Sequence, residues 1–347
     1  MASQDKKVLV TGHQGFIGSV LIGLLAEQGY EVAGMDTGYY AEHCLIPPVP
    51  VAREIIKDIR DLALADLEGF DAVIHLAALS NDPVGNLSSA LTEDINHRAS
   101  VRLAALAKQA GVRRFLYSSS CIMYGVNDLA VVTEESPLAP QTEYARSKVK
   151  SEREISQMAG DGFSPVFLRN GTIYGLSPRM RFDTVLNNLV ATAYTTGKVV
   201  LQGNGKVWRP VSHLYDVCAY FAHVLAAPIE TIHNQAFNCG DDSLNHEIIE
   251  LARFAAEAVP GSEIVILDRT DADQRTYKVD FTKFRAAFPD FVFQWNAKRG
   301  AQDLYRQFDR IKLDAETVSG HGFTRLKTLK QLMAEGRVDH DLRWVKK

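Results

Sequence analysis

Cysteine is scarce in this chain of 347 residues, and its four cysteines, Cys44, Cys121, Cys218 and Cys239, stand far apart. No two of them form a C-x-x-C pair, so the sequence predicts neither a zinc site nor a dithiol redox motif. We therefore expect no bound metal. Scattered thiols are typical of a protein that works in a reducing compartment.

Long apolar runs and an excess of positive charge are also missing. No window reaches the roughly 18 to 20 apolar residues that a membrane span needs. The amino-terminal stretch MASQDKKVLVTG lacks the apolar core of a signal peptide. The formal net charge is −4, whereas nucleic-acid binders usually present a basic surface. These features predict a cytoplasmic protein that binds neither a membrane nor a nucleic acid.

Apolar strands alternate with amphipathic helices in the first half of the chain. We expect strands at residues 7–11, 30–35, 53–57, 71–77 and 114–118, and helices at 16–28, 88–110 and 142–160. Such alternation predicts a parallel sheet with helices on both faces. Runs such as AVIHLA do not alternate with polar residues, which fits strands that are covered on both sides.

A glycine-rich turn, Gly12-His13-Gln14-Gly15-Phe16-Ile17-Gly18, joins the first strand to the first helix. Glycines at this spacing permit a tight turn and close approach of the backbone to a pyrophosphate. The helix N-terminus adds unpaired N–H groups and a partial positive charge. The turn predicts dinucleotide binding in a Rossmann-type doubly wound sheet.

Two aspartates end the strands that follow the glycine turn. Asp36 can accept hydrogen bonds from both adenosine ribose hydroxyls and would repel a 2′-phosphate, so NAD is favoured over NADP. Asp58, after the third strand, could reach the adenine edge.

The strand–helix alternation loosens after about residue 171, and a chain of this length favours two lobes. We expect an NAD-binding domain over residues 1–172, completed by about 207–240. Residues 173–206 and 241–347 are expected to form a smaller α/β substrate-binding lobe at the C-terminal edge of the sheet, together with a tail. The stretch 324–344 reads as a surface helix and tail.

The stretch YARSK places Tyr144 four residues before Lys148. Residues at this spacing are neighbours on any helix surface, so the pair alone could be one polar face of an ordinary helix. Its context decides between this interpretation and a catalytic pair.

Several motifs, in order, resemble the extended short-chain dehydrogenase/reductase family. Within it, the chain is similar to the NAD-dependent nucleotide-sugar epimerases and dehydratases of the UDP-glucose 4-epimerase type. The motifs are the glycine turn, HLAAL at 75–79, SSSCIMYG at 118–125, YARSK at 144–148, LRNGTIYG at 168–175, WRPVSHLYDV at 208–217 and DQRTYKVD at 273–280. The resemblance covers most of the chain and fades after roughly residue 310.

The resemblance implies a set of functional residues. The implied catalytic residues are Ser120, Tyr144 and Lys148. The implied cofactor-binding residues are Gly12, Gln14, Gly15, Phe16, Ile17, Gly18, Asp36, Asp58, Ile59, Leu76, Ala77, Ala78, Asn96, Ser118, Tyr144 and Lys148. The implied substrate-binding residues are Ser120, Tyr144, Thr172, Arg181, Arg209 and Arg275. The implied substrate is a nucleotide-diphosphate sugar, and the implied assembly is a homodimer formed through the helices at 88–110 and 142–160.

The expected chemistry explains the spacing in YARSK. A free tyrosine has a pKa near 10, too high for a base at neutral pH. We expect the Lys148 ammonium and a positive nicotinamide ring to lower the pKa of Tyr144. Tyr144 would then take the hydroxyl proton of a sugar alcohol while the same carbon gives hydride to NAD. Thr142 is placed to cap this helix.

Two departures from the family pattern bear on the reaction. The residues after Ser120 are Cys121 and Ile122, where 4,6-dehydratases that resemble this site carry Asp-Glu, so dehydration is not expected. Thr172 stands where many members have an asparagine, and SNDPVGNL could shape the sugar pocket. A 4-epimerase is the leading prediction, with a reductase or dehydrogenase of a keto-sugar nucleotide as the alternative. A non-enzymatic dinucleotide sensor is the third.

Overall fold

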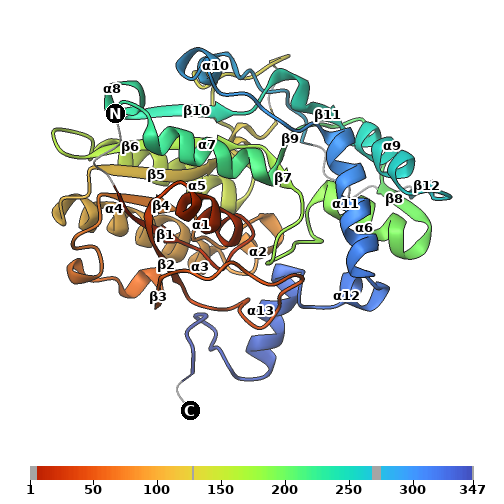
Figure 1. Ribbon diagram of the computed structural model, residues 1–347, viewed down its shortest axis with the longest axis horizontal. Helices are drawn as coiled ribbons and strands as arrows, with labels where there is room; N and C mark the ends of the chain where they lie inside the picture. Colours follow the sequence, from red (N-terminus) through yellow and green to blue (C-terminus); the bar gives the residue numbers. More distant parts are fainter. Residues whose placement is uncertain (1–5, 127–128, 268–274, 346–347) are drawn as a thin grey trace.

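The computed structural model describes residues 6–126, 129–267 and 275–345, and its centre is a parallel sheet (Figure 1). Within these ranges seven strands pair in the order β3-β2-β1-β4-β5-β6-β10, every neighbouring pair parallel. The strands are β1 Lys7–Thr11, β2 Glu31–Asp36, β3 Arg53–Ile56, β4 Ala72–His75, β5 Arg114–Ser120, β6 Ser164–Asn170 and β10 Gln235–Cys239. The predicted doubly wound Rossmann-type sheet is confirmed.

Helices cover both faces of this sheet because successive side chains of a strand point to opposite faces. Val8 and Val10 of β1 belong to the core on the side of α1 and α7, whereas Leu9 belongs to the core on the side of α4 and α5. These helices are α1 Gly18–Glu27, α7 Leu214–Ala226, α4 Ala99–Gln109 and α5 Glu143–Ser156. Helices α4 and α5 pack against each other, and pairing of two chains through them stays a prediction.

The helix expected at 88–110 is interrupted in the structure. A short helix α3, Ser89–Thr92, runs into a wider π-helical segment, Glu93–Arg98, before α4 begins. Inside this segment the carbonyl of Asn96 accepts the hydroxyls of Ser100 and Ser151. Side-chain groups that enter the backbone ladder in this way are a known cause of irregular helices.

A smaller lobe lies beside the large sheet, at the right of Figure 1. In the described residues, β11, β9 and β7 form one small sheet, and β12 pairs with β8 in another. These strands are β7 Thr172–Tyr174, β8 Lys198–Gln202, β9 Trp208–His213, β11 Asn245–Glu247 and β12 Glu263–Leu267. The helices of this lobe are α6 Val185–Thr196, α9 Ile248–Ala258 and α11 Ala297–Ile311.

Short helical segments complete the connections. They are α2 Asp82–Gly85, α8 Ile229–Ile232, α10 Thr282–Ala287 and α12 Ala315–Ser319, with single 3-10 turns at Ile59–Asp61, Leu64–Asp66, Cys121–Tyr124 and Asp242–Leu244. No helix in the described part of the chain combines the length and the apolar character that a bilayer crossing requires.

The C-terminal segment returns to the first part of the chain. Helix α13, Arg325–Ala334, lies below the large sheet in Figure 1, away from the other helices of the small lobe. Its Leu329 and Leu332 join the core that contains Leu9, as do Val338 and Leu342 of the tail. The expected surface helix therefore has one buried face, and that face packs against the core of the large sheet.

Candidate active site

A cavity of about 820 Å³ opens at the C-terminal ends of β1, β4 and β5 and extends to the small lobe. In open parallel sheets, ligands bind where the strand order reverses, here between β1 and β4. Most of the residues implied by the resemblance line this cavity: Gly12, Gly15, Phe16, Ile17, Gly18, Asp36, Asp58, Ile59, Leu76, Ala77, Ala78, Ser118, Ser120, Tyr144, Lys148, Thr172, Arg181, Arg209 and Arg275. The fold thus brings together residues that lie up to 263 positions apart in the chain, from Gly12 to Arg275.

Two of the implied cofactor residues, Gln14 and Asn96, do not line the cavity. The Gln14 side chain donates to Glu54, and its backbone N–H donates to Asp36. The Asn96 amide both donates to and accepts from the backbone of Leu79. Asn96 therefore positions the segment after β4, and a direct cofactor contact of either residue stays a prediction.

The backbone of the glycine turn packs too closely to admit a side chain at two positions. Gly12 has a φ of +75°, and a Cβ there would lie 2.7 Å from the Ala77 backbone nitrogen. A Cβ on Gly18 would lie 2.3 Å from the Gly12 carbonyl oxygen. Both distances are shorter than real contacts, so the turn requires glycine at these positions.

The two aspartates at the strand ends have different surroundings. The Asp36 carboxylate accepts the backbone N–H groups of Gln14 at 3.1 Å and Gly38 at 3.0 Å, and it borders the cavity. Asp58 is paired with Arg60 at 2.7 Å and with Arg343 of the C-terminal tail at 3.2 Å. Two guanidinium groups thus already bind the Asp58 carboxylate. Contact of Asp58 with the adenine stays a prediction.

Helix α5 presents Tyr144 and Lys148 to the cavity. The Thr142 hydroxyl accepts the Ala145 backbone N–H at 3.2 Å and caps the helix, as the sequence predicts. The buried Lys148 ammonium donates to the carbonyl of Ser118 at 2.6 Å. Burial lowers the pKa of Lys148 to about 7, while Glu152 opposes this shift.

Burial raises the pKa of Tyr144 to about 12. The Arg181 guanidinium acts in the opposite direction and lowers this pKa, the Asp82 carboxylate raises it, and a hydrogen bond with Ser120 lowers it. The Lys148 ammonium, expected to lower the pKa, is directed at the Ser118 carbonyl and lies 5.7 Å from the centre of the Tyr144 ring. Arg181 is therefore the cation that most affects the phenol in this structure.

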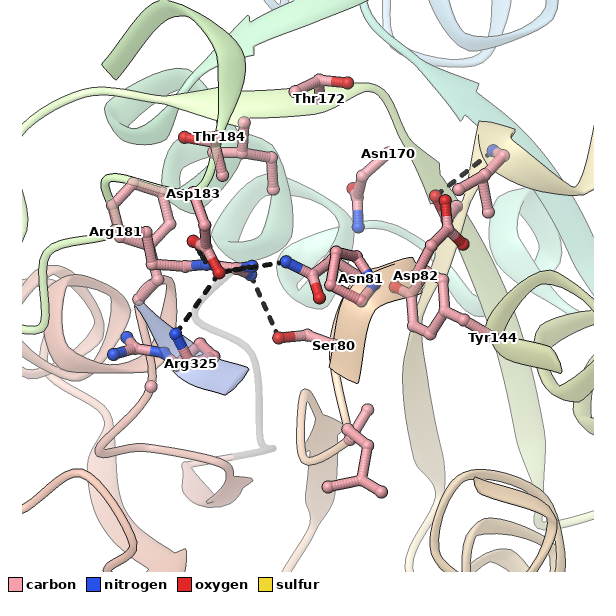
Figure 2. A pocket seen from close by; sticks show the side chains of 18 of the residues that line it. Ser80, Asn81, Asp82, Tyr144, Asn170, Thr172, Arg181, Asp183, Thr184 and Arg325 are labelled. Carbon is pink, nitrogen blue, oxygen red and sulfur yellow. Dashed lines mark hydrogen bonds and ion pairs between the residues drawn. The ribbon is translucent and has the colours of Figure 1, made fainter. Parts of the chain in front are cut away.

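A polar cluster faces Tyr144 across the cavity, as Figure 2 shows. The Arg181 guanidinium donates to Asp183 at 2.8 Å and to the Ser80 hydroxyl at 3.0 Å. The Asn81 amide donates to the same Asp183 carboxylate at 3.0 Å, and the Arg325 backbone N–H lies 3.4 Å from it. Sequence reasoning named Arg181 but missed Asp183 and Arg325, although SNDPVGNL was singled out as a possible pocket segment.

The two arginines implied as diphosphate contacts already have protein partners. Arg275 is paired with Asp82 at 2.7 Å. Arg209 donates to the backbone carbonyls of Trp208 and Arg275, and its guanidinium lies over the ring of Tyr277. Of the DQRTYKVD motif, Asp273 and Gln274 lie outside the described residues.

The positions around Ser120 carry no free acid–base group. Cys121 is fully buried, and its thiol donates to the carbonyl of Arg169. Burial raises the pKa of this thiol above its usual range. Ile122 borders the cavity with an alkyl side chain. Among the described residues, no group of three or more His, Cys, Asp or Glu side chains is placed to share a metal ion.

Known proteins resemble this chain in sequence and in fold. The chain is 27% identical to a UDP-glucose 4-epimerase of Bacillus subtilis, over 90% of this chain and 98% of that protein. The structure of MoeE5 with UDP-glucose and NAD matches with a TM-score of 0.74 and 27% identity, over 88% of this chain and all of that one. DesIV of Streptomyces venezuelae, a dTDP-glucose 4,6-dehydratase solved with NAD, matches with a TM-score of 0.74 and 26% identity, over 88% and 97%.

A match to a family model identifies the family of the chain. The model described as the NAD-dependent epimerase/dehydratase family matches residues 8–240. This range contains the glycine turn, Asp36, Ser120 and the Tyr144–Lys148 pair. It is about two thirds of the sequence, and the chain therefore belongs to the NAD-dependent epimerase/dehydratase family.

Proposed function

We propose that the protein is an NAD-dependent nucleotide-sugar 4-epimerase. The observation that carries this proposal is that Ser120 and Tyr144 border one cavity, while Cys121 and Ile122, the two residues after Ser120, offer no acid or base. Such a site can move one hydroxyl proton, which is the only acid–base step that inversion at C4 requires.

The residues present fit a dinucleotide. The glycine turn borders the cavity in a tight backbone arrangement that excludes a Cβ at Gly12 and Gly18, and Asp36 stands at the end of β2, where a ribose diol is expected. Bound there, NAD supplies the hydride acceptor and donor of the reaction. Lys148 is buried beneath this groove and would hold the nicotinamide ribose.

Tyr144 would remove the C4 hydroxyl proton and later return it. Its pKa must fall for this step, and the cation that lowers it most is Arg181. The Ser120 hydroxyl would hydrogen-bond the same substrate oxygen and hold it between the two side chains. The resulting 4-keto sugar must turn in the cavity before hydride returns to its other face.

Dehydration is another reaction catalysed within the same family. Elimination of water needs a further acid and base beside the sugar, and the positions that would carry them here hold a buried thiol and an alkyl group. Loss of a proton from the Cys121 thiol is disfavoured by its burial. These features favour epimerisation over dehydration.

The alternative is a reductase or dehydrogenase of a keto-sugar nucleotide, which would use the same Ser120, Tyr144 and Lys148. The experiment is a screen of UDP-, dTDP-, GDP- and CDP-sugars with NAD, with products followed by NMR and mass spectrometry. An epimerase is expected to interconvert C4 epimers without net formation of NADH. Stoichiometric NADH would favour the alternative, and a product lighter by one water would show a dehydratase.

A further inference from the structure

Arg325, the first residue of α13, faces the cavity although it comes from the C-terminal segment. Its side chain is 3% exposed. The guanidinium stacks on the ring of Tyr40 at 4.2 Å, and one of its N–H groups donates to the carbonyl of Arg179 at 2.7 Å. Burial, followed by the neighbouring Arg181 guanidinium, lowers the pKa of Arg325 to about 10.

A chain of hydrogen bonds connects Arg325 with the start of α1, because the backbone N–H of Arg179 donates to the Ser177 hydroxyl at 3.2 Å. Two residues before Arg179, the Ser177 hydroxyl donates to the carbonyl of Phe16 at 2.8 Å and lies 3.0 Å from the Ser19 hydroxyl. Phe16 and Ser19 flank the start of α1. Arg325 is therefore linked through Arg179 and Ser177 to the helix N-terminus that the sequence predicts as the pyrophosphate site, and it borders the same cavity as the glycine turn.

Within the described ranges, Arg325 lacks the carboxylate partner that Arg181 and Arg275 have in the same cavity. Arg181 is paired with Asp183, and Arg275 with Asp82. Within the described ranges, no carboxylate lies within ion-pair distance of the Arg325 guanidinium, and its hydrogen-bond acceptor is a backbone carbonyl. A buried cation without a carboxylate partner is costly unless a bound anion compensates it.

Helix α13, which carries Arg325, is fixed to the rest of the protein by core packing and by contacts of the tail. Leu329 and Leu332 anchor α13 in the core. The tail that follows is tied to the loop after β2, because Arg337 pairs with Glu42 and the Trp344 indole donates to the carbonyl of Thr37. The tail after α13 is therefore bonded to the loop that follows Asp36. Asp36 is the residue expected to bind the ribose, so these contacts connect it with the helix that carries Arg325.

We propose that Arg325 binds the pyrophosphate of the dinucleotide, so that α13 is part of the cofactor site. The proposal rests on the proposed use of NAD, and it adds a contact from outside residues 8–240, the range that the family model matches. The ligand chemistry is a pyrophosphate, for which a guanidinium fork is suited by its geometry and charge.

The test compares Arg325→Gln with Arg325→Lys in the full chain, with Lys327→Gln as the matched control. Lys327 lies on the same helix, is exposed and donates to the Ser319 carbonyl. NAD, ADP and adenosine are titrated by calorimetry into protein freed of nucleotide. Arg325→Gln is expected to weaken NAD and ADP about 10- to 100-fold, the usual effect of a charged hydrogen bond. Adenosine, which has no phosphate, should bind unchanged, as should all three ligands to Lys327→Gln.

Two outcomes would overturn the proposal. Unchanged ADP affinity in Arg325→Gln would show that the guanidinium does not touch the pyrophosphate. Equal weakening of ADP and adenosine would show that Arg325 only shapes the adenosine wall through Tyr40. If Arg325→Gln does not fold, Arg325→Lys, which keeps the charge but loses the fork, is expected to weaken ADP and not adenosine. The ADP titrations need no sugar, so a wrong 4-epimerase assignment would leave them intact.

Discussion

Oδ2 of Asp82 lies 2.7 Å from a guanidinium nitrogen of Arg275, and Oδ1 of the same carboxylate accepts the Thr142 hydroxyl at 2.6 Å. Asp82 thus connects the segment after β4, the N-terminal cap of α5 and an arginine implied as a diphosphate contact. Its negative charge also raises the pKa of Tyr144. One carboxylate therefore affects both the expected substrate contact and the expected base.

Asp82→Asn is expected to shift the pH profile of kcat. The substitution removes a charge that raises the pKa of Tyr144, so this pKa falls. If deprotonated Tyr144 is the base, the rising limb of the profile moves to lower pH. The measurement is kcat against pH on the substrate found by screening, with the exposed Asp290→Asn as control. A shift to higher pH would contradict the electrostatic role of Asp82.

Tyr144→Phe keeps the ring and removes the hydroxyl that exchanges the proton. Turnover should fall by about 10²- to 10⁴-fold, the range that general acid–base catalysis provides. Ser120→Ala should cost less, because it removes a hydrogen bond and leaves the base. Tyr215→Phe, an exposed tyrosine on α7, is the control for loss of a phenolic hydroxyl. Near-normal turnover in Tyr144→Phe, with none in Ser120→Ala, would show that Tyr144 is not the base.

Lys148 should make the stability of the protein depend on pH. Burial lowers its pKa from 10.5 to about 7 in the folded protein, so between these values the unfolded chain binds more protons. The free energy of unfolding should therefore rise with pH across this window, by at most about 1.4 kcal/mol per pH unit. The rise should be absent from Lys148→Met and present in Lys150→Met, an exposed control on the same helix. Urea unfolding from pH 6 to 10 measures it, and equal slopes in wild type and Lys148→Met would refute it.

Asp36 should select NAD over NADP. Its carboxylate is held by two backbone N–H groups at the end of β2, and a 2′-phosphate there would be repelled. Calorimetry should show tight NAD and weak NADP binding in wild type, with a smaller difference in Asp36→Ala. NADP that binds wild type as tightly as NAD would remove this argument.

Local sequence determined the main features of the fold and the location of the site. The alternation of strands and helices, the Gly12–Gly18 turn and the i,i+4 spacing of Tyr144 and Lys148 depend on residues that are close in the chain, so periodicity and spacing predict them. The Thr142 cap belongs to the same class, because its acceptor and donor are three residues apart.

The tertiary structure decided which charges meet and what surrounds them. Asp82 and Arg275 are 193 positions apart, and Asp58 meets Arg343 only because the tail returns to the first sheet. The spacing of residues along the sequence does not predict such contacts, because they form only when separate elements pack together. The same packing buries Tyr144, Lys148 and Arg325, and burial is the largest cause of the pKa shift of each. The sequence predicted the Tyr144–Lys148 pair, whereas the folded chain set the electrostatic environment of these two side chains.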